Sequence, residues 1–499
     1  MNSAAAPSPG EQSRMAESCC IRFYCYGFAL AAALYGAPGL AVDHVWIVGG
    51  GYDPQSSQAQ IEQNVIWARR AIDAASGARK LNVFFTDGDA PGKDVKAWEP
   101  RPETKDALQP FARTFVGYEL SGEYYRNHRI AGVSGGTEAG PLRERLAREF
   151  SALGPGDRAL FIFNGHGGYD RKNTARNTIQ LWNNTSLNAR DMEALFSKID
   201  PAVPARFVFT QCYAGGFARL IRTEAKKIGA LSSANRCGFM AEAEDRPAEG
   251  CSAGVNVNDY RDYSTYFFAA LSGRTRQGRA LPVNPDRNRD GTVSLYEAHL
   301  YALRVAESAD LPRSTSEDFL EHWKPGVLGW TRRLKNKPAP LDAQANPYSQ
   351  LAEEVARELD LPAEKTARRR QIEQRQQEYD DADARQNEER ARLAREIYNL
   401  QRDIQRDVTM RWPEVRVPHT EAYRQFLHRE RDAAQDFILK HEKYPSLVEK
   451  QTRFSALIGE NLDTARKLTR LELIERLEKL GKQRERFEAM ASDADKAAY

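Results

Sequence analysis

Two stretches of the sequence decide the fold: Phe161-Ile-Phe-Asn-Gly-His-Gly167 and Phe207-Val-Phe-Thr-Gln-Cys-Tyr-Ala-Gly-Gly216. Each is an apolar, β-prone run that ends in a reactive side chain among glycines. The carboxyl ends of parallel strands meet at one edge of a sheet, where doubly wound folds bind their ligands. The chain between the two runs is long enough for one crossover connection, so the strands can be neighbours. The sequence therefore predicts that the imidazole of His166 and the thiol of Cys212 lie at the same sheet edge.

The residues around these two side chains resemble a known family. The motifs His166-Gly167 and Gln211-Cys212-Tyr213-Ala214-Gly215 are similar to those of the cysteine peptidase clan that contains legumains, caspases, metacaspases and gingipains. The glycine three residues after the cysteine is closer to legumains and metacaspases than to caspases. The resemblance covers residues 44–330. It implies a caspase/legumain-like α/β fold, an αβα sandwich with a mostly parallel sheet, and a bacterial-type cysteine endopeptidase.

The chemistry expected of this pair follows from the ionisation of a thiol. A catalytic cysteine needs a partner that favours the thiolate, and His166 can act as the general base for Cys212 and then protonate the leaving amine. A helix that starts near Phe217 would also favour the anion. The resemblance implies an oxyanion hole made of the backbone N–H groups of Gly167 and Cys212. Candidates for orienting the imidazole are Gln211, Asn164 and Asp170. The alternative is a small buried cysteine beside a structural histidine.

Four acidic residues are candidates for the pocket that binds the substrate residue before the scissile bond: Asp53, Glu242, Glu244 and Asp245. In the resembling family, the loop after the first strand and the segment after the cysteine helix line this pocket. An acidic pocket would favour arginine or lysine in a protein or peptide substrate. The alternative is that each carboxylate lies at the surface in water.

The stretch Asp286-Arg-Asn-Arg-Asp-Gly-Thr-Val-Ser-Leu-Tyr-Glu297 matches the twelve-residue EF-hand calcium loop at every diagnostic position. Gly291 provides the sharp turn. The expected calcium ligands are the side chains of Asp286, Asn288, Asp290, Ser294 and Glu297 and the carbonyl of Thr292. Gly278, Pro282 and Pro285 remove the incoming helix, so the sequence predicts a structural site rather than a sensor. The alternative is a turn that binds no metal.

The N-terminal residues 1–41 have the features of a secretory signal peptide. An apolar run from Phe23 to Leu34 follows Arg22, and small residues lead to a cleavage site near Ala41. The run is short for a membrane span, so we expect a secreted or periplasmic protein with no stable membrane span after cleavage. An uncleaved membrane anchor is the alternative.

Cleavage of the signal would leave three cysteines: Cys212, Cys237 and Cys251. An odd number in an exported protein indicates one free thiol beside one disulfide. Because Cys212 needs a thiol for catalysis, the expected disulfide is Cys237–Cys251. Three buried thiols are the alternative.

The composition changes near residue 335, which predicts three parts: a peptidase domain at 42–334, a linker at 335–349 and a helical, coiled-coil-like region at 350–499. Leu393, Ile397, Leu400 and Ile404 are spaced by four, three and four residues, as in a coiled-coil seam. We expect an antiparallel helical hairpin or small bundle. It would serve either in self-association or as an autoinhibitory cover, as the helical C-terminal segment of legumains does.

The overall composition fits these predictions. The chain has 499 residues, of which 41% are hydrophobic, and its formal net charge of +3 gives no electrostatic reason to expect nucleic acid. The leading hypothesis is an exported cysteine endopeptidase that acts through an acyl-enzyme and is stabilised by calcium. Two alternatives remain. One is a catalytically silent caspase-like binding or scaffold protein, and the other is a peptide ligase or transpeptidase on the same fold.

Overall fold

The computed structural model describes residues 43–74, 79–99, 109–116, 122–225, 230–326, 346–417 and 420–499. The expected signal peptide and residues 335–345 of the expected linker lie outside the described residues. None of the helices in the described ranges is long and apolar enough to cross a membrane.

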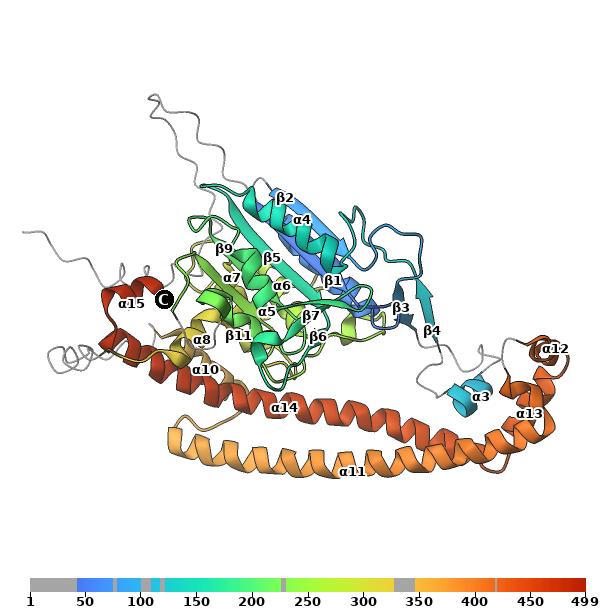
Figure 1. The fold of residues 1–499 in the computed structure, drawn as a ribbon. Coiled ribbons are helices and arrows are strands. Elements are labelled where there is room, and N and C mark those ends of the chain that lie inside the picture. The colour runs from blue at the N-terminus through green and yellow to red at the C-terminus, as the bar shows by residue number, and fades with distance from the viewer. Residues whose placement is uncertain are drawn as a thin grey trace, which may run out of the picture. The chain divides into compact units, whose positions relative to one another are not determined.

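A six-stranded sheet with the order β11-β10-β9-β5-β1-β2 forms the centre of the fold (Figure 1). Its strands are β1 (Asp43–Gly50), β2 (Arg79–Phe85), β5 (Arg158–Gly165), β9 (Ala205–Phe209), β10 (Arg236–Met240) and β11 (Arg313–Ser314). Neighbouring strands from β2 to β10 pair in parallel, and only the short β11 runs antiparallel to β10. The predicted α/β architecture with a mostly parallel sheet is confirmed.

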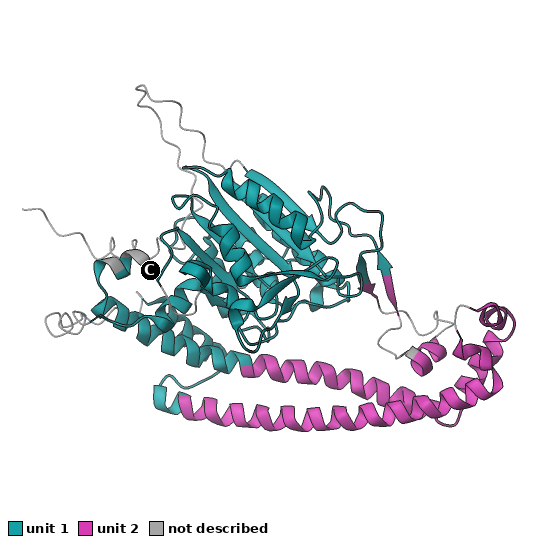
Figure 2. Cartoon of the chain, in the orientation of Figure 1, with its two compact units in different colours: residues 1–96, 125–368, 469–499 teal, residues 97–124, 369–468 magenta. Residues whose placement is uncertain are grey.

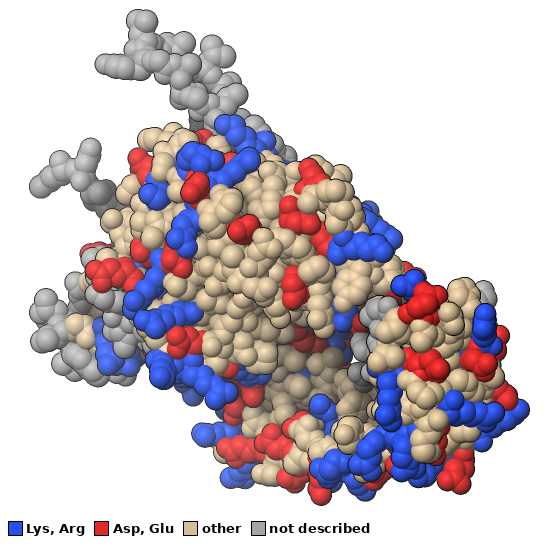
Figure 3. All heavy atoms as spheres, turned by 45° about the vertical axis from the view of Figure 1, so that its right-hand side comes forward, with Lys and Arg blue, Asp and Glu red and all other residues tan. Residues whose placement is uncertain are grey.

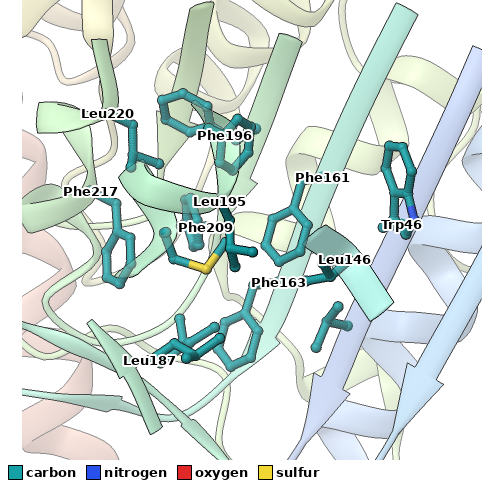
Figure 4. Close-up of a cluster of buried hydrophobic side chains, with 14 of the residues drawn as sticks. Trp46, Leu146, Phe161, Phe163, Leu187, Leu195, Phe196, Phe209, Phe217 and Leu220 are labelled. Carbon is teal, nitrogen blue, oxygen red and sulfur yellow. The ribbon is translucent and has the colours of Figure 1, made fainter. Parts of the chain in front are cut away.

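Helices cover both faces of this sheet because successive side chains of each strand point to opposite faces. On one face, Phe161 and Phe163 of β5 and Phe209 of β9 pack in a buried cluster (Figure 4). That cluster is completed by helices α4 (Ala139–Ser151) and α5 (Ala189–Phe196) and the 3-10 helix η4 (Ala214–Ile221). The other face packs against α2 (Ala59–Ala74), α6 (Tyr263–Ser272) and α7 (Leu295–Val305).

The remaining elements are short. A three-stranded antiparallel sheet, made of β6 (Gly167–Gly168), β7 (Thr178–Leu181) and β8 (Thr185–Asn188), follows β5 directly. A two-stranded sheet consists of β3 (Val95–Trp98) and β4 (Glu123–Arg126). The other short helices are α3 (Gln109–Phe111), the π-helical turn η1 (Ala112–Val116), η3 (Thr174–Arg176), η5 (Thr223–Ala225), η6 (Val257–Asp259), α8 (Thr315–His322), η8 (Pro413–Arg416) and α15 (Asp493–Ala498).

The chain divides into two compact units whose boundaries differ from the expected domains (Figure 2). Unit 1 comprises residues 1–96, 125–368 and 469–499, and unit 2 comprises 97–124 and 369–468. Unit 1 thus includes α10 (Pro347–Glu358) and the last part of α14 (Tyr444–Met490). There the buried Arg476 binds Glu317 of α8, and Arg470 donates a hydrogen bond of 2.9 Å to the carbonyl oxygen of Leu303.

Unit 2 is a helical hairpin with added short helices. Its long helices are α11 (Lys365–Arg411) and α14, and α12 (Glu421–Arg429) and α13 (Arg431–Leu439) lie between them in the chain. Arg453 of α14 pairs with Glu389 of α11 at 2.9 Å, whereas Lys450 of α14 pairs with Glu396 of α11 at 2.5 Å. Partner numbers rise along α11 as they fall along α14, so the predicted antiparallel hairpin is confirmed.

An apolar cluster closes one end of this hairpin. Ile404 from the predicted seam is buried there with Trp412, Phe426 and Ile438. Phe111 and Phe115, which come from the segment between β3 and β4, pack against the same cluster. On the face drawn in Figure 3, Lys and Arg side chains lie among Asp and Glu side chains. The sequence did not predict that an insertion from the first half of the chain would complete the helical unit.

Candidate active site

His166 and Cys212 follow two adjacent parallel strands. β5 and β9 pair up to Phe163 and Phe209, and both reactive residues lie just beyond that point, at the carboxyl edge of the sheet. A Cβ atom on Gly167 would overlap the carbonyl oxygen of Cys212. The backbone after His166 therefore packs directly on the backbone of Cys212, which only glycine allows. The structure brings the two predicted residues to the same edge.

The hydrogen bonds of His166 define its tautomer. Nε2 lies 2.7 Å from the carbonyl oxygen of Ser56 and 2.9 Å from Oε1 of Gln58. A carbonyl oxygen can only accept, so Nε2 carries the hydrogen and Nδ1 has the lone pair. Burial lowers the pKa of His166, although the Ser56 carbonyl and the charge of Asp53 act to raise it. At neutral pH the imidazole is therefore uncharged and can take a proton on Nδ1.

The residues that hold His166 differ from the three candidates named from the sequence. The side-chain oxygen of Asn164 accepts hydrogen bonds from Thr210 and Ser264. Asp170 accepts from the backbone of its own turn, and the buried side-chain amide of Gln211 has no hydrogen-bond partner among the residues that the structure describes. Ser56 and Gln58 belong to the loop between β1 and α2, and no pattern in the sequence links that loop to the His166 strand.

The thiol of Cys212 is held by one neighbouring residue. The backbone N–H of Ala248 donates to Sγ at 3.3 Å, and the carbonyl oxygen of Ala248 lies 3.7 Å from the same sulfur. Burial raises the pKa of Cys212; the N–H of Ala248 acts against this rise, and the charge of Asp310 adds to it. At neutral pH Cys212 is therefore a thiol rather than the expected thiolate. Its nucleophilic form requires transfer of the proton to a base during attack.

The turn after Cys212 has an unusual backbone. Tyr213 adopts the left-handed conformation with φ 61° and ψ 21°, which non-glycine residues rarely adopt. Its ring stacks on that of Tyr169 with centroids 4.9 Å apart, and its N–H donates to the carbonyl oxygen of Arg246 at 2.9 Å. The expected helix near Phe217 is the 3-10 helix η4, which starts earlier, at Ala214. These contacts fix the direction in which the Cys212 segment leaves the sheet.

The thiol that contacts His166 is that of Cys251. Its Sγ lies 3.5 Å from Nδ1 of His166, and no hydrogen bond joins His166 to Cys212 in the described part of the chain. The expected Cys237–Cys251 disulfide is wrong, because both residues carry thiols. Cys237 is buried near the start of β10, whereas Cys251 reaches the sheet edge on a loop. The odd number of cysteines predicted one free thiol, that of Cys212, and paired Cys251 with Cys237. In the structure Cys251 instead contacts His166.

The segment 244–252, which we name the active-site loop, is anchored along its length. Arg246 forms an ion pair with Glu472 of α14 at 2.5 Å within unit 1. The carboxylate of Glu249 accepts hydrogen bonds from the hydroxyl of Ser308 at 2.7 Å and the N–H of Ala309 at 2.8 Å. The N–H of Ser252 donates to Gln60, and the carbonyl of Ser252 accepts from the backbone N–H of Gln60. Ala248 and Cys251 are thus held beside the two reactive residues.

The four acidic pocket candidates are in different surroundings. Asp53 is near His166 and accepts the N–H of Ser56 at 2.7 Å. Glu242 is completely buried and lies 3.6 Å from Arg246, whereas Glu244 pairs with Arg219 at 2.7 Å. Asp245 is exposed. Glu242 and Glu244 are thus already engaged by arginines of the chain, and the preference for basic substrates stays a prediction.

The predicted calcium loop is a compact turn of oxygen donors. Asp286 accepts the N–H groups of Asp290 at 3.2 Å and Gly291 at 3.0 Å, and Gly291 has φ +87°. Glu297 folds back to accept the N–H groups of Arg287 and Asn288. The carboxylates and carbonyls suit calcium chemically. No group of three or more His, Cys, Asp and Glu side chains within the described ranges is arranged to hold a metal ion, so the site stays a prediction.

Comparisons with known proteins add little. No protein-family model matches the chain, and no curated protein matches it. Among solved structures, a crystal structure of a protein from Geobacter sulfurreducens aligns with 47% of this chain and 82% of its own chain. The sequence identity is 12% and the TM-score is 0.28, which supports no conclusion about fold type or function.

Proposed function

We propose that this protein is a cysteine endopeptidase of the caspase/legumain-like type, with Cys212 as nucleophile and His166 as general base. The observation that carries the proposal is the meeting of two strand ends. Gly167, next to His166, packs on the carbonyl of Cys212, and the imidazole presents its lone pair on Nδ1. A neutral base and a protonated thiol at one sheet edge suit acyl transfer.

The reaction follows from these protonation states. As Sγ of Cys212 attacks the substrate carbonyl carbon, its proton passes to Nδ1 of His166, and the carbonyl electrons move to the oxygen. The backbone N–H groups of Gly167 and Cys212 would bind that oxyanion. The proton on Nδ1 then goes to the leaving amine as the C–N bond breaks. Water hydrolyses the resulting thioester, and Cys212 regains its proton.

The contact between Cys251 and His166 sets a condition for this chemistry. Nδ1 faces the thiol of Cys251 at 3.5 Å, so a substrate has to displace that thiol before Cys212 can transfer its proton. The same contact favours a second candidate, a catalytically silent protein that binds peptides at this edge. In that case His166 would only hold the active-site loop through Cys251.

Calcium and export complete the proposal. Asp286, Asn288, Asp290, Ser294, Glu297 and the carbonyl of Thr292 would hold calcium. The ion would cross-link the loop and take no part in the reaction. The apolar run from Phe23 to Leu34 and the small residues before Ala41 support an exported location. The substrate would be a protein or peptide with arginine or lysine before the cleaved bond.

A fluorogenic peptide panel varied at the residue before the cleaved bond tests this function. The full chain, assayed with and without reductant, is expected to hydrolyse peptides with arginine or lysine at that position. A peptidyl electrophile is expected to label Cys212. Absence of both hydrolysis and labelling would support the silent binding protein, and capture of the acyl group by added amines in preference to water would support the ligase.

A further inference from the structure

Two thiols converge on the edge of the sheet from different parts of the chain. Ala248 of the active-site loop contacts the sulfur of Cys212 through both its N–H and its carbonyl. Three residues later, Cys251 of the same loop contacts the imidazole of His166. Burial raises the pKa of Cys251, and the neighbouring thiolate charge of Cys212 would raise it further. The active-site loop therefore brings Cys251 to the same sheet edge as Cys212, close enough for the charge of one sulfur to act on the other.

A glycine in an unusual backbone conformation precedes Cys251. Gly250 has φ +121°, a conformation open to glycine and rarely to other residues. The anchors of the loop lie on either side, at Glu249 and Ser252. Gly250 and Cys251 are the two residues between these anchors, so a turn of Cys251 towards Cys212 would have to take place at them.

We propose that Cys212 and Cys251 are a redox pair, and that a peroxide converts them into a reversible disulfide that closes the site. The inhibitory consequence rests on the proposed function. The disulfide itself does not, because it requires only the two thiols, the imidazole and an oxidant.

The oxidation is balanced with one equivalent of hydrogen peroxide. As the sulfur of the Cys212 thiol attacks one peroxide oxygen, the O–O bond breaks, the departing hydroxide takes up the thiol proton and leaves as water, and Cys212 becomes a sulfenic acid. Cys251 then loses its proton to Nδ1 of His166, which accepts it across the 3.5 Å contact. The Cys251 sulfur attacks the sulfenyl sulfur, the S–S bond forms, and hydroxide leaves and takes that proton as a second water. A dithiol reductant reverses the disulfide by exchange.

Closure of the site follows from what the disulfide removes. The sulfur of Cys212 would be bound in the disulfide and could not attack a substrate carbonyl. Oxidation beyond the sulfenic acid would be prevented, because the thiol of Cys251 captures that intermediate. Cys251 would thus protect Cys212 from irreversible damage.

Peptide mapping of the full-length protein under non-reducing conditions tests the pair. The protein is treated with hydrogen peroxide, remaining thiols are blocked, and the chain is digested. Trypsin places Cys212 in peptide 207–219 but leaves Cys237 and Cys251 together in peptide 237–261, since a proline follows Arg246. A second protease that cuts after glutamate separates them at Glu249. The expected product is a cross-linked peptide containing Cys212 and Cys251.

Three proteins are compared: the wild type, Cys251→Ser and Cys237→Ser, each relative to its own untreated sample. The wild type and Cys237→Ser are expected to form the cross-link and to recover at least about 90% of their untreated peptidase activity after reduction. In Cys251→Ser, Cys212 should advance to sulfinic or sulfonic acid and stay inactive. Cys212 oxidised to those acids in the wild type, or cross-linked to Cys237, would overturn the proposal. A Cys212–Cys251 cross-link in a protein that hydrolyses no peptide would uphold the redox pair and reject the proposed function.

Discussion

The thiol of Cys251 lies 3.5 Å from Nδ1 of His166, the atom that would accept the proton of the nucleophile. Cys212, at the end of the neighbouring strand, instead contacts the backbone of Ala248. The site therefore holds its base and its expected nucleophile apart. The first step of catalysis would be the displacement of Cys251 from the imidazole.

Replacing Gly167 with alanine should damage the site. The added Cβ would overlap the carbonyl oxygen of Cys212, and relief of the clash would shift the Cys212 segment. We expect a loss of about 1–3 kcal/mol in the free energy of unfolding and a large drop in peptide hydrolysis. Gly140→Ala is the matched control, because a Cβ there meets no atom within 4 Å. Equal stability and activity in both variants would show that Gly167 does not set the spacing of the site.

Alkylation of Cys212 should depend on pH in a way that reports its raised pKa. Burial favours the neutral thiol, so deprotonation moves to higher pH than the ordinary thiol value of about 8.5. The rate of labelling by iodoacetamide, followed by peptide mass spectrometry, is expected to be low at neutral pH and to keep rising above that value. Cys212 should react before Cys251. A rate that is already maximal at neutral pH would show that Cys212 is a resting thiolate.

The positions of His166 and Cys212 could be predicted because both follow apolar runs. Such runs identify the strands, and the topology of parallel sheets brings their carboxyl ends to one edge. The position of Cys251 could not be predicted in this way. It lies on a loop without hydrophobic periodicity, and the loop is fixed by long-range contacts such as Arg246 with Glu472.

Calcium should raise the melting temperature of the wild type, because a ligand that binds only the folded state stabilises it. Glu297→Gln should remove most of this shift, since the bidentate carboxylate is lost. Glu297 also holds the backbone of Arg287 and Asn288, so the readout is the calcium-dependent shift and not the basal melting temperature. Asp290→Asn, which keeps the shape of the side chain, gives an independent measure. Melting curves of the wild type that are the same in calcium and in chelator would exclude the site.

A chain truncated at residue 335 should lose stability rather than gain activity. Truncation removes the parts of α10 and α14 that belong to unit 1, including Arg476. Burial alone would raise the pKa of Glu317, but Arg476 and His299 outweigh it and lower the pKa to about 2. Loss of Arg476 leaves this buried carboxylate without its main partner, at a cost of about 3–5 kcal/mol.

Thermal unfolding and peptide hydrolysis of the truncated chain measure this effect. A truncated protein that is well folded and more active, and that the added helical fragment inhibits, would instead establish the region as a cover. The boundary itself could not be read from the sequence. Residues 350–499 have one charged, helix-prone composition, and their division between two units depends on specific contacts such as Arg476 with Glu317.

The most direct test of the proposed function is hydrolysis of a fluorogenic peptide by Cys212→Ala, with Cys237→Ala as the matched control and Cys251→Ala in parallel. Folding of each variant is verified by its melting temperature. The account predicts that Cys212→Ala is folded and at least about a thousand-fold slower than the wild type, while Cys237→Ala remains active. Wild-type turnover by Cys212→Ala would contradict it, and loss of activity in Cys251→Ala alone would identify Cys251 as the nucleophile instead.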